Sequence, residues 1–210
     1  MKKNKETKIL FAIKQYLINN KKEYIIVSLI FIIGIFIGVL FINNIKEGQI
    51  AEINSYLNNF VSKFKDMENI NYTQLLKSCV TEKLILAISI WFFGTTVIGI
   101  PIVFGILLYR GFCLGYTISA CVTSLGTSKG IIFTLSTLVL QNIIFIPAIL
   151  ALAVSGIKFY RSIVKNKENI KLEILRHTLF SIIMVIALIF AEIIDVFIST
   201  NFLKLIIKYF

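Results

Sequence analysis

The chain has 210 residues, of which 57% are hydrophobic, with a mean hydropathy of +0.86 and only two prolines. This composition excludes an ordinary water-soluble domain and is typical of an integral membrane protein. The formal net charge of +11 does not indicate nucleic-acid binding, because no basic folded module remains outside the apolar runs.

Five uncharged or nearly uncharged stretches are the main feature of the sequence. A helix needs about 20 apolar residues to cross a hydrocarbon core of roughly 30 Å, and four of the stretches reach that length. The stretches are continuous rather than alternating, which predicts helices and not barrel strands. We therefore expect an all-α, polytopic integral membrane protein of about five transmembrane helices, at 24–42, 84–109, 111–128, 131–157 and 178–199.

Residues 1–23 are basic and amphipathic. Their apolar residues recur at helical spacing while lysines take the other positions, a pattern typical of a helix on the inner membrane surface. A solvated basic tail is the alternative. No signal-cleavage site follows the first apolar run, so we expect the first transmembrane helix, 24–42, to stay attached as an anchor. Its Gly34 and Gly38 form a small-xxx-small pattern, which favours close helix packing in lipid.

Residues 43–83 carry five lysines and five acidic residues and therefore show no basic bias. We expect this segment to be extracytoplasmic and amphipathic. Its apolar stripe either docks on the outer surface of the protein itself, lies on lipid, or binds an extracytoplasmic partner. The candidates for partner contact on the stripe are Ile53, Leu57, Phe60 and Phe64.

The sequence GIPIVFGILLYRGFCLGY, at 99–116, interrupts an apolar run with glycines, a proline and an arginine. Pro101 removes a backbone donor, so we expect a kink near 98–101. Arg110 is predicted to end the span in a tight inner turn, because arginine is usual at the interface. An arginine deeper in the bilayer would instead be a functional candidate. The glycines expected to let helices approach closely here are Gly99, Gly105, Gly111 and Gly115.

Polar side chains lie inside the two later spans. Gln141 and Asn142 fall near mid-membrane, with Pro147 behind them, and amides in hydrocarbon need hydrogen-bond partners. Glu192 and Asp195 are three residues apart and share a helix face. Hydrogen bonding between helices accounts for the amides, and hydration near the outer interface accounts for the acids. A polar substrate site and a proton or cation path are the alternatives.

Lysine and arginine gather in 1–23 and in the loop 158–177. Basic segments tend to stay cytoplasmic, so the N-terminus and this loop are placed inside, and Lys129 at an outer turn. Residues 84–199 are then expected to form a four-helix membrane bundle, and the short tail 200–210 lies outside. Most of the positive charge faces anionic lipid of the inner leaflet.

The sequence contains no catalytic motif that we recognise. His177 is the one histidine, and there is no H-E-x-x-H, no G-x-S-x-G and no P-loop. No Cys/His pattern predicts a metal site, and the three cysteines are expected to be buried, unreactive thiols. We therefore expect no enzymatic activity and no cofactor.

Two blocks of the sequence, GTTVIGIPIVFGILLYRGFCLGYTIS at 94–119 and LQNIIFIPAILALAVSGIKFY at 140–160, resemble the stage II sporulation protein M family. The resemblance covers nearly the whole chain and fits the sporulation branch of that family. It implies a role in endospore formation, in the mother-cell membrane at the sporulation septum. Family members there act in a complex with two peptidoglycan-degrading proteins, which thin the septal wall and drive engulfment of the forespore.

The resemblance implies a non-catalytic membrane scaffold that recruits and positions these extracytoplasmic peptidoglycan hydrolases. Membrane lipid is a further expected partner, and nucleic acid is not. A small membrane transporter or channel component that uses Gln141, Asn142, Glu192 and Asp195 is the alternative. A third possibility is a lipid-interacting remodelling protein built around the basic N-terminal helix.

Overall fold

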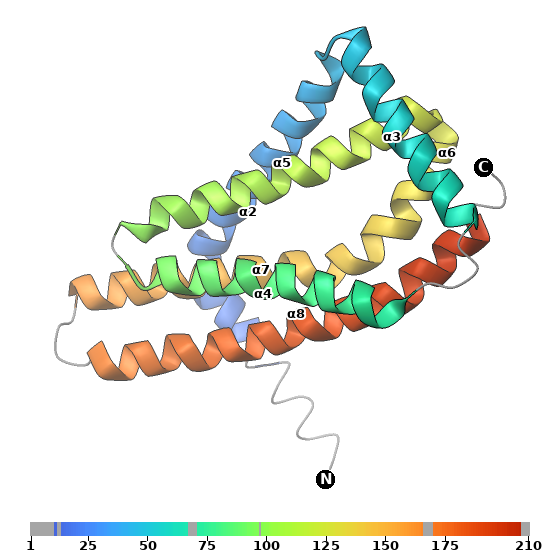
Figure 1. Cartoon of the computed structure of the whole chain (residues 1–210). Helices are drawn as coiled ribbons and strands as arrows, with labels where there is room; N and C mark the ends of the chain where they lie inside the picture. The colour runs from blue at the N-terminus through green and yellow to red at the C-terminus, as the bar shows by residue number, and fades with distance from the viewer. Residues whose placement is uncertain (1–10, 12–13, 67–70, 97, 166–169, 207–210) are drawn as a thin grey trace.

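The computed structural model describes residues 11, 14–66, 71–96, 98–165 and 170–206, and every regular element in those ranges is a helix (Figure 1). The expected all-α class is thereby confirmed. The elements in chain order are α2 (Lys21–Asn43), α3 (Glu47–Asp66), α4 (Tyr72–Gly94), α5 (Gly99–Leu125), α6 (Thr127–Thr134), the π-helical turn η1 (Leu135–Val139), α7 (Leu140–Lys165) and α8 (Ile170–Ile206).

Four of the described helices, α2, α5, α7 and α8, are long and apolar enough to cross a bilayer. A fifth, α4, lies along α8 (Figure 1). Trp91 Nε1 donates to Thr178 Oγ1 at 3.3 Å near one end of α4, and Tyr72 Oη donates to Asn201 Oδ1 at 3.3 Å near the other. Because 23 residues of helix extend about 35 Å, α4 crosses the bundle as well. The protein is therefore a polytopic membrane protein.

The directions of these helices follow from their contacts. Gly34 of α2 lies against Leu108 of α5, and Gly38 lies against Phe112, so these two helices run parallel. α8 runs antiparallel to α4 and to α7, since it meets each of them in reverse order along the chain. With the N-terminus inside, as the basic segments favour, α2, α5 and α8 run outward and α4 and α7 run inward.

Glycines bring α2 and α5 into backbone contact. A Cβ atom added at Gly34 would lie 2.2 Å from the Leu108 carbonyl oxygen, and one at Gly111 would lie 2.2 Å from the Phe31 carbonyl oxygen. Gly38 and Gly115 are equally close to the opposite backbone. Helices that carry side chains at these positions cannot approach so closely, and close approach is what van der Waals packing in lipid requires.

The chain leaves α4 at Gly94 and enters α5 at Gly99, so it reverses there and not at Arg110, and the turn predicted at Arg110 is wrong. Gly99–Leu125 is one continuous helix, which joins the two spans expected at 84–109 and 111–128. Pro101 lies in the first turn of α5, where backbone N–H groups have no partner within the helix, so the missing donor of proline costs nothing. Instead of the expected kink within one helix, the chain has a break between α4 and α5. At Gly99 a Cβ atom would lie 1.8 Å from the Phe93 carbonyl oxygen, so the tight turn depends on glycine.

The extracytoplasmic segment predicted at 43–83 is too long at its C-terminal end. Only α3, the amphipathic helix Glu47–Asp66, lies outside the bundle, across its outer end (Figure 1). Residues 72–83 form the first half of α4 and pack alongside α8. Hydropathy misplaced them because they carry Lys77, Glu82 and Lys83, and charges count against a span unless their partners are known.

The core lies where α2, α4, α5, α7 and α8 meet. Its fully buried side chains include Val27, Ile90, Leu107, Ile149 and Leu152. Close to the inner end of the core, Glu23 of α2 forms an ion pair with Arg161 of α7. This pair fixes the beginning of α2 against the end of α7, next to the basic loop.

The two ends of the described chain are helical. Residues 14–19 form a short helix before α2, with Leu17 and Ile18 exposed, as a helix on the inner membrane surface requires. At the other end α8 continues through 206, so the first part of the tail expected at 200–210 belongs to the last helix. Most of the predicted basic N-terminus and residues 207–210 lie outside the described residues.

Candidate functional site

A cluster of charged and amide side chains lies in the middle of the bundle. Lys83 is the central residue of α4, and Glu82 is next to it. Arg110 lies in the interior of α5, beside Gly111, which touches the middle of α2 at Phe31. This depth is far from either interface, so Arg110 is the deep arginine that the sequence analysis kept as an alternative.

The cluster joins four helices through its carboxylates. Arg110 Nη2 donates to Glu82 Oε1 at 2.9 Å, which connects α5 to α4. Lys83 Nζ lies 3.8 Å from Glu192 Oε1, which connects α4 to α8. Gln141 Nε2 donates to the same Glu192 oxygen at 2.9 Å and adds α7. Each charge in the cluster therefore has an opposite charge close to it.

Glu192 is the most enclosed member, with 0% of its surface exposed. Its second oxygen, Oε2, has no hydrogen-bond partner among the described residues. A carboxylate oxygen that is buried without a partner loses its hydration at a cost of about 1–3 kcal/mol or more. This unfavourable burial of a carboxylate lies at the centre of the bundle, so Glu192 is the first residue to test for function.

An aromatic ring lies beneath both cations. Lys83 Nζ is 4.8 Å from the centre of the Phe145 ring, and Arg110 Cζ is 5.8 Å from it. Such cation–π contacts are worth about 2 kcal/mol when they are desolvated. Phe145 on α7 therefore holds the two cations together even though their own charges repel.

The structure brings only some of the polar residues named in the sequence analysis into contact with one another. Gln141 and Glu192 share a hydrogen bond, whereas Asn142 bonds the Leu138 backbone oxygen of its own helix, at 2.7 Å. Asp195 accepts a hydrogen bond from Ser199, also on its own helix. Sequence reasoning missed Glu82 and Lys83 because they were placed outside the membrane. The one signal in the sequence was Arg110 itself. If it lay inside the bilayer, its positive charge would need an acidic partner there.

The described residues contain no group of three His, Cys, Asp or Glu side chains that would hold a metal ion. The cluster instead contains ion pairs in a medium of low dielectric. Such groups either fix the packing of helices or pass protons and ions.

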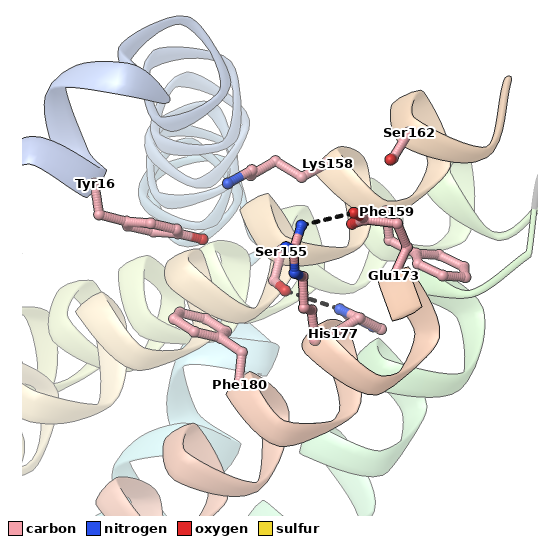
Figure 2. Close-up of a pocket in the computed structure, with 9 residues that line it drawn as sticks. Tyr16, Ser155, Lys158, Phe159, Ser162, Glu173, His177 and Phe180 are labelled. Atoms are coloured by element: carbon pink, nitrogen blue, oxygen red, sulfur yellow. Dashed lines mark hydrogen bonds and ion pairs between the residues drawn. The ribbon is translucent and has the colours of Figure 1, made fainter. Parts of the chain in front are cut away.

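A second polar site lies at the inner end of the bundle (Figure 2). It is a cavity of about 410 Å³ between α7, α8 and the short helix before α2. The buried Ser155 Oγ and His177 Nδ1 lie 2.8 Å apart at its floor, and Phe159 stacks on the imidazole with ring centres 5.3 Å apart. We refer to it as the inner pocket; its lining residues are Tyr16, Ser155, Lys158, Phe159, Ser162, Glu173, Arg176, His177 and Phe180.

Tyr16 forms one wall of the inner pocket. Its ring stacks on Phe180 with ring centres 5.4 Å apart, and Lys158 Nζ lies 4.7 Å from the centre of the same ring. Burial raises the pKa of the Tyr16 phenol, and the nearby Glu23 carboxylate raises it further. The phenol is therefore neutral at physiological pH and can act as a hydrogen-bond donor.

The outer helix α3 is held against the bundle by its apolar stripe. Leu57 and Val61 pack against Cys121, Phe133 and Leu203. Among the other proposed contact residues, Phe60 meets Phe133 edge to face with ring centres 6.5 Å apart, and Ile53 is partly buried. The side chain of Phe64 lies outside the described residues. These contacts favour docking on the protein itself, the first alternative for this stripe.

The model of one protein family, stage II sporulation protein M, matches residues 27–200 of the chain. The matched region runs from the first helix of the bundle to near the end of the last, and includes the intramembrane cluster and α3. Neither a search of curated proteins nor a search of solved structures finds a match to this chain.

Proposed function

The chain belongs to the stage II sporulation protein M family and so has a role in sporulation, and we propose on this premise that it is a non-catalytic membrane scaffold. In this proposal it recruits and positions extracytoplasmic peptidoglycan hydrolases at the sporulation septum, from the mother-cell membrane. The hydrolases cleave the septal wall, and the scaffold supports its thinning and the engulfment of the forespore.

The observation that carries the proposal is the placement of α3. A scaffold needs a surface that faces the wall and is fixed relative to the membrane. Because Leu57 and Val61 bind α3 to the outer end of the bundle, its opposite side faces away from the membrane protein. Tyr56, on the exposed part of α3, has 73% of its surface exposed, and tyrosine is among the residues that most often dominate binding interfaces.

The proposal therefore assigns partner contact to the other face of the same helix. The residues first proposed to contact a partner, among them Leu57 and Phe60, are engaged by the protein itself. The exposed positions of α3 around Tyr56 are Glu52, Ser55, Asn59, Ser62 and Lys63. They are polar, as the surface of a helix that meets a water-exposed partner would be.

Recovery of partners from membranes of sporulating cells tests the scaffold. The tagged protein is cross-linked mildly and purified, and its partners are quantified by mass spectrometry. We expect wall hydrolases with the unaltered protein and about tenfold less or lower recovery with Tyr56→Glu or Asn59→Arg. Ser128→Glu, at an exposed position on α6 rather than on α3, serves as the control and should recover them fully.

The possible outcomes separate the parts of the proposal. If the unaltered protein recovers no wall hydrolase, the scaffold role is rejected. If recovery is normal with both α3 variants, and all variants are present in membranes at equal amounts, then α3 is not the contact surface.

A second function, a small transporter or channel component, is favoured by one observation, the intramembrane cluster. Glu192 combines complete burial with a carboxylate oxygen that lacks a partner, close to Lys83. Buried acids next to a lysine occur in proton and cation pathways. This function predicts proton or cation flux in vesicles that contain the purified protein, and loss of that flux in Glu192→Gln. A scaffold alone shows no flux above that of protein-free vesicles.

A further inference from the structure

The inner pocket lies next to an apolar groove. The groove has a volume of about 830 Å³ and lies between α7, α8 and the start of α2. Tyr16 and Phe180 line both spaces, and their stacked rings form the boundary between them. The apolar wall of the groove includes Pro147, Ala148, Ala151, Met184 and Ala187.

The polar side of this boundary offers groups that bind phosphate. Lys158, Ser162 and Tyr16 all line the inner pocket, and Figure 2 shows Lys158 extending toward Tyr16, with Ser162 one turn further along α7. Arg176 also lines the pocket, although one of its nitrogens donates to Glu173 at 2.9 Å. Lys158 makes no ion pair among the described residues; its ammonium group lies over the Tyr16 ring. It therefore remains available to an anion.

The position of the inner pocket indicates which kind of anion is available to bind there. It lies at the inner ends of α7 and α8, beside the basic loop, where the cytoplasmic leaflet presents anionic headgroups. A headgroup in the pocket has its acyl chains directed toward the groove, because Tyr16 and Phe180 border both. A free phosphate would use the polar groups but leave the groove empty.

We propose that the inner pocket and the apolar groove together bind one anionic phospholipid of the cytoplasmic leaflet. The phosphate is held by Lys158, with Ser162 and the Tyr16 hydroxyl as further donors. One acyl chain lies along α7, over the small side chains of Ala148 and Ala151. The short helix before α2 covers this lipid and is held in place by it. The proposal is independent of the scaffold role.

The test measures lipid binding to the purified full-length protein by native mass spectrometry, with thermal unfolding in detergent alongside it. The probes are phosphatidylglycerol, phosphatidylcholine and glycerol 1-phosphate. We expect phosphatidylglycerol to bind most tightly and to raise the unfolding temperature. Lys158→Gln should weaken its binding about fivefold, the effect of one lysine near an anionic headgroup. The control Lys171→Gln removes an exposed charge of the same loop that does not line the pocket, and should not.

A second variant tests the groove. Ala151→Leu fills the space for the acyl chain, so it should weaken phosphatidylglycerol binding and leave the binding of glycerol 1-phosphate unchanged. Its unfolding temperature without lipid shows whether the variant is folded. Equal binding of phosphatidylglycerol and phosphatidylcholine would overturn the selection for negative charge. Equal binding of phosphatidylglycerol and glycerol 1-phosphate, with no effect of Ala151→Leu in a folded protein, would overturn the lipid in favour of a free phosphate.

Discussion

At the scale of single residues, the protein is defined by charges that it keeps inside the bilayer. Lys83 and Glu192 lie on different helices and face each other across the bundle centre. In hydrocarbon an unpaired charge costs several kcal/mol, whereas a paired and hydrogen-bonded one costs much less. Each of these residues is therefore tolerated because of the other, and removal of one alone should be worse than removal of both.

Lys83→Met should lower the free energy of unfolding by about 3 kcal/mol, because it leaves the Glu192 carboxylate buried without a cation. Denaturant titration in mixed micelles measures the change. Lys77→Met removes an exposed lysine from the same helix and should change stability by less than about 0.5 kcal/mol. The double variant Lys83→Met with Glu192→Gln should recover most of the loss. If the double variant is as unstable as Lys83→Met alone, the pairing is not what makes Lys83 important.

At the scale of helices, two kinds of contact build the molecule. Glycines join α2 to α5 by backbone approach, and apolar side chains join α3 to the outer end of the bundle. The first contact lies in lipid, where small residues allow van der Waals packing; the second lies at the outer surface, where burial of apolar area provides the stability. Each can be disrupted separately.

Gly34→Ala should destabilise the bundle by about 1–3 kcal/mol, because the added methyl group meets the backbone of α5, which cannot yield as a side chain would. Gly105 of α5 is the matched control, since a Cβ atom added there has nothing within 4 Å. Gly105→Ala should be neutral or slightly stabilising. Thermal unfolding of both variants in the same detergent makes the comparison. Equal losses of stability in the two variants would show that the α2–α5 contact is not the cause of the effect.

Leu57→Glu should detach α3 from the bundle, because it places a charge in the contact with Cys121, Phe133 and Leu203. Hydrogen exchange in α3 should then increase by about tenfold or more, which corresponds to a loss of about 1.4 kcal/mol in local stability. Tyr56→Glu, at the exposed neighbouring position, should leave exchange nearly unchanged. A slow exchange in both variants would mean that α3 is held by other contacts.

At the scale of the whole molecule, the five long helices of the bundle alternate in direction, so Lys21 and Ile206 lie at opposite ends of it. One end of the bundle carries the connection from Gly94 to Gly99 and the basic end of α7, and the other end carries α3 and the turn at Gly126. The positive charges predict that the first of these ends faces the cytoplasm. In the structure Arg110 lies within α5, between the two ends of the bundle, whereas the sequence analysis predicts an inner turn there. The two topologies therefore differ at Arg110.

Thiol labelling of a variant without its native cysteines distinguishes a continuous α5 from a turn at Arg110. Ser55→Cys on α3 should react with a membrane-impermeant reagent in intact cells. Thr96→Cys should react only after permeabilisation, because it lies in the inner turn. Tyr109→Cys should be protected in both conditions if α5 is continuous, since it then lies at mid-membrane depth. Labelling of Tyr109→Cys after permeabilisation would restore the inner turn predicted at Arg110.

The sequence by itself determined the class of the protein. Hydropathy depends on each residue's own transfer into hydrocarbon, and charge bias depends on loops that do not need partners. These local properties were enough to predict an all-α membrane protein with several helices long and apolar enough to cross a bilayer. The resemblance of two sequence blocks was enough to indicate the family.

Only the tertiary structure decided where α4 and α5 begin and end, and which polar residues form a site. Glu82 and Arg110 are 28 positions apart, and Gln141 and Glu192 are 51 apart. A scale that scores residues one at a time excludes such charges from the membrane, because it assigns each its full desolvation cost. The folded bundle lowers that cost by bringing opposite charges together, and this depends on contacts that no single segment contains.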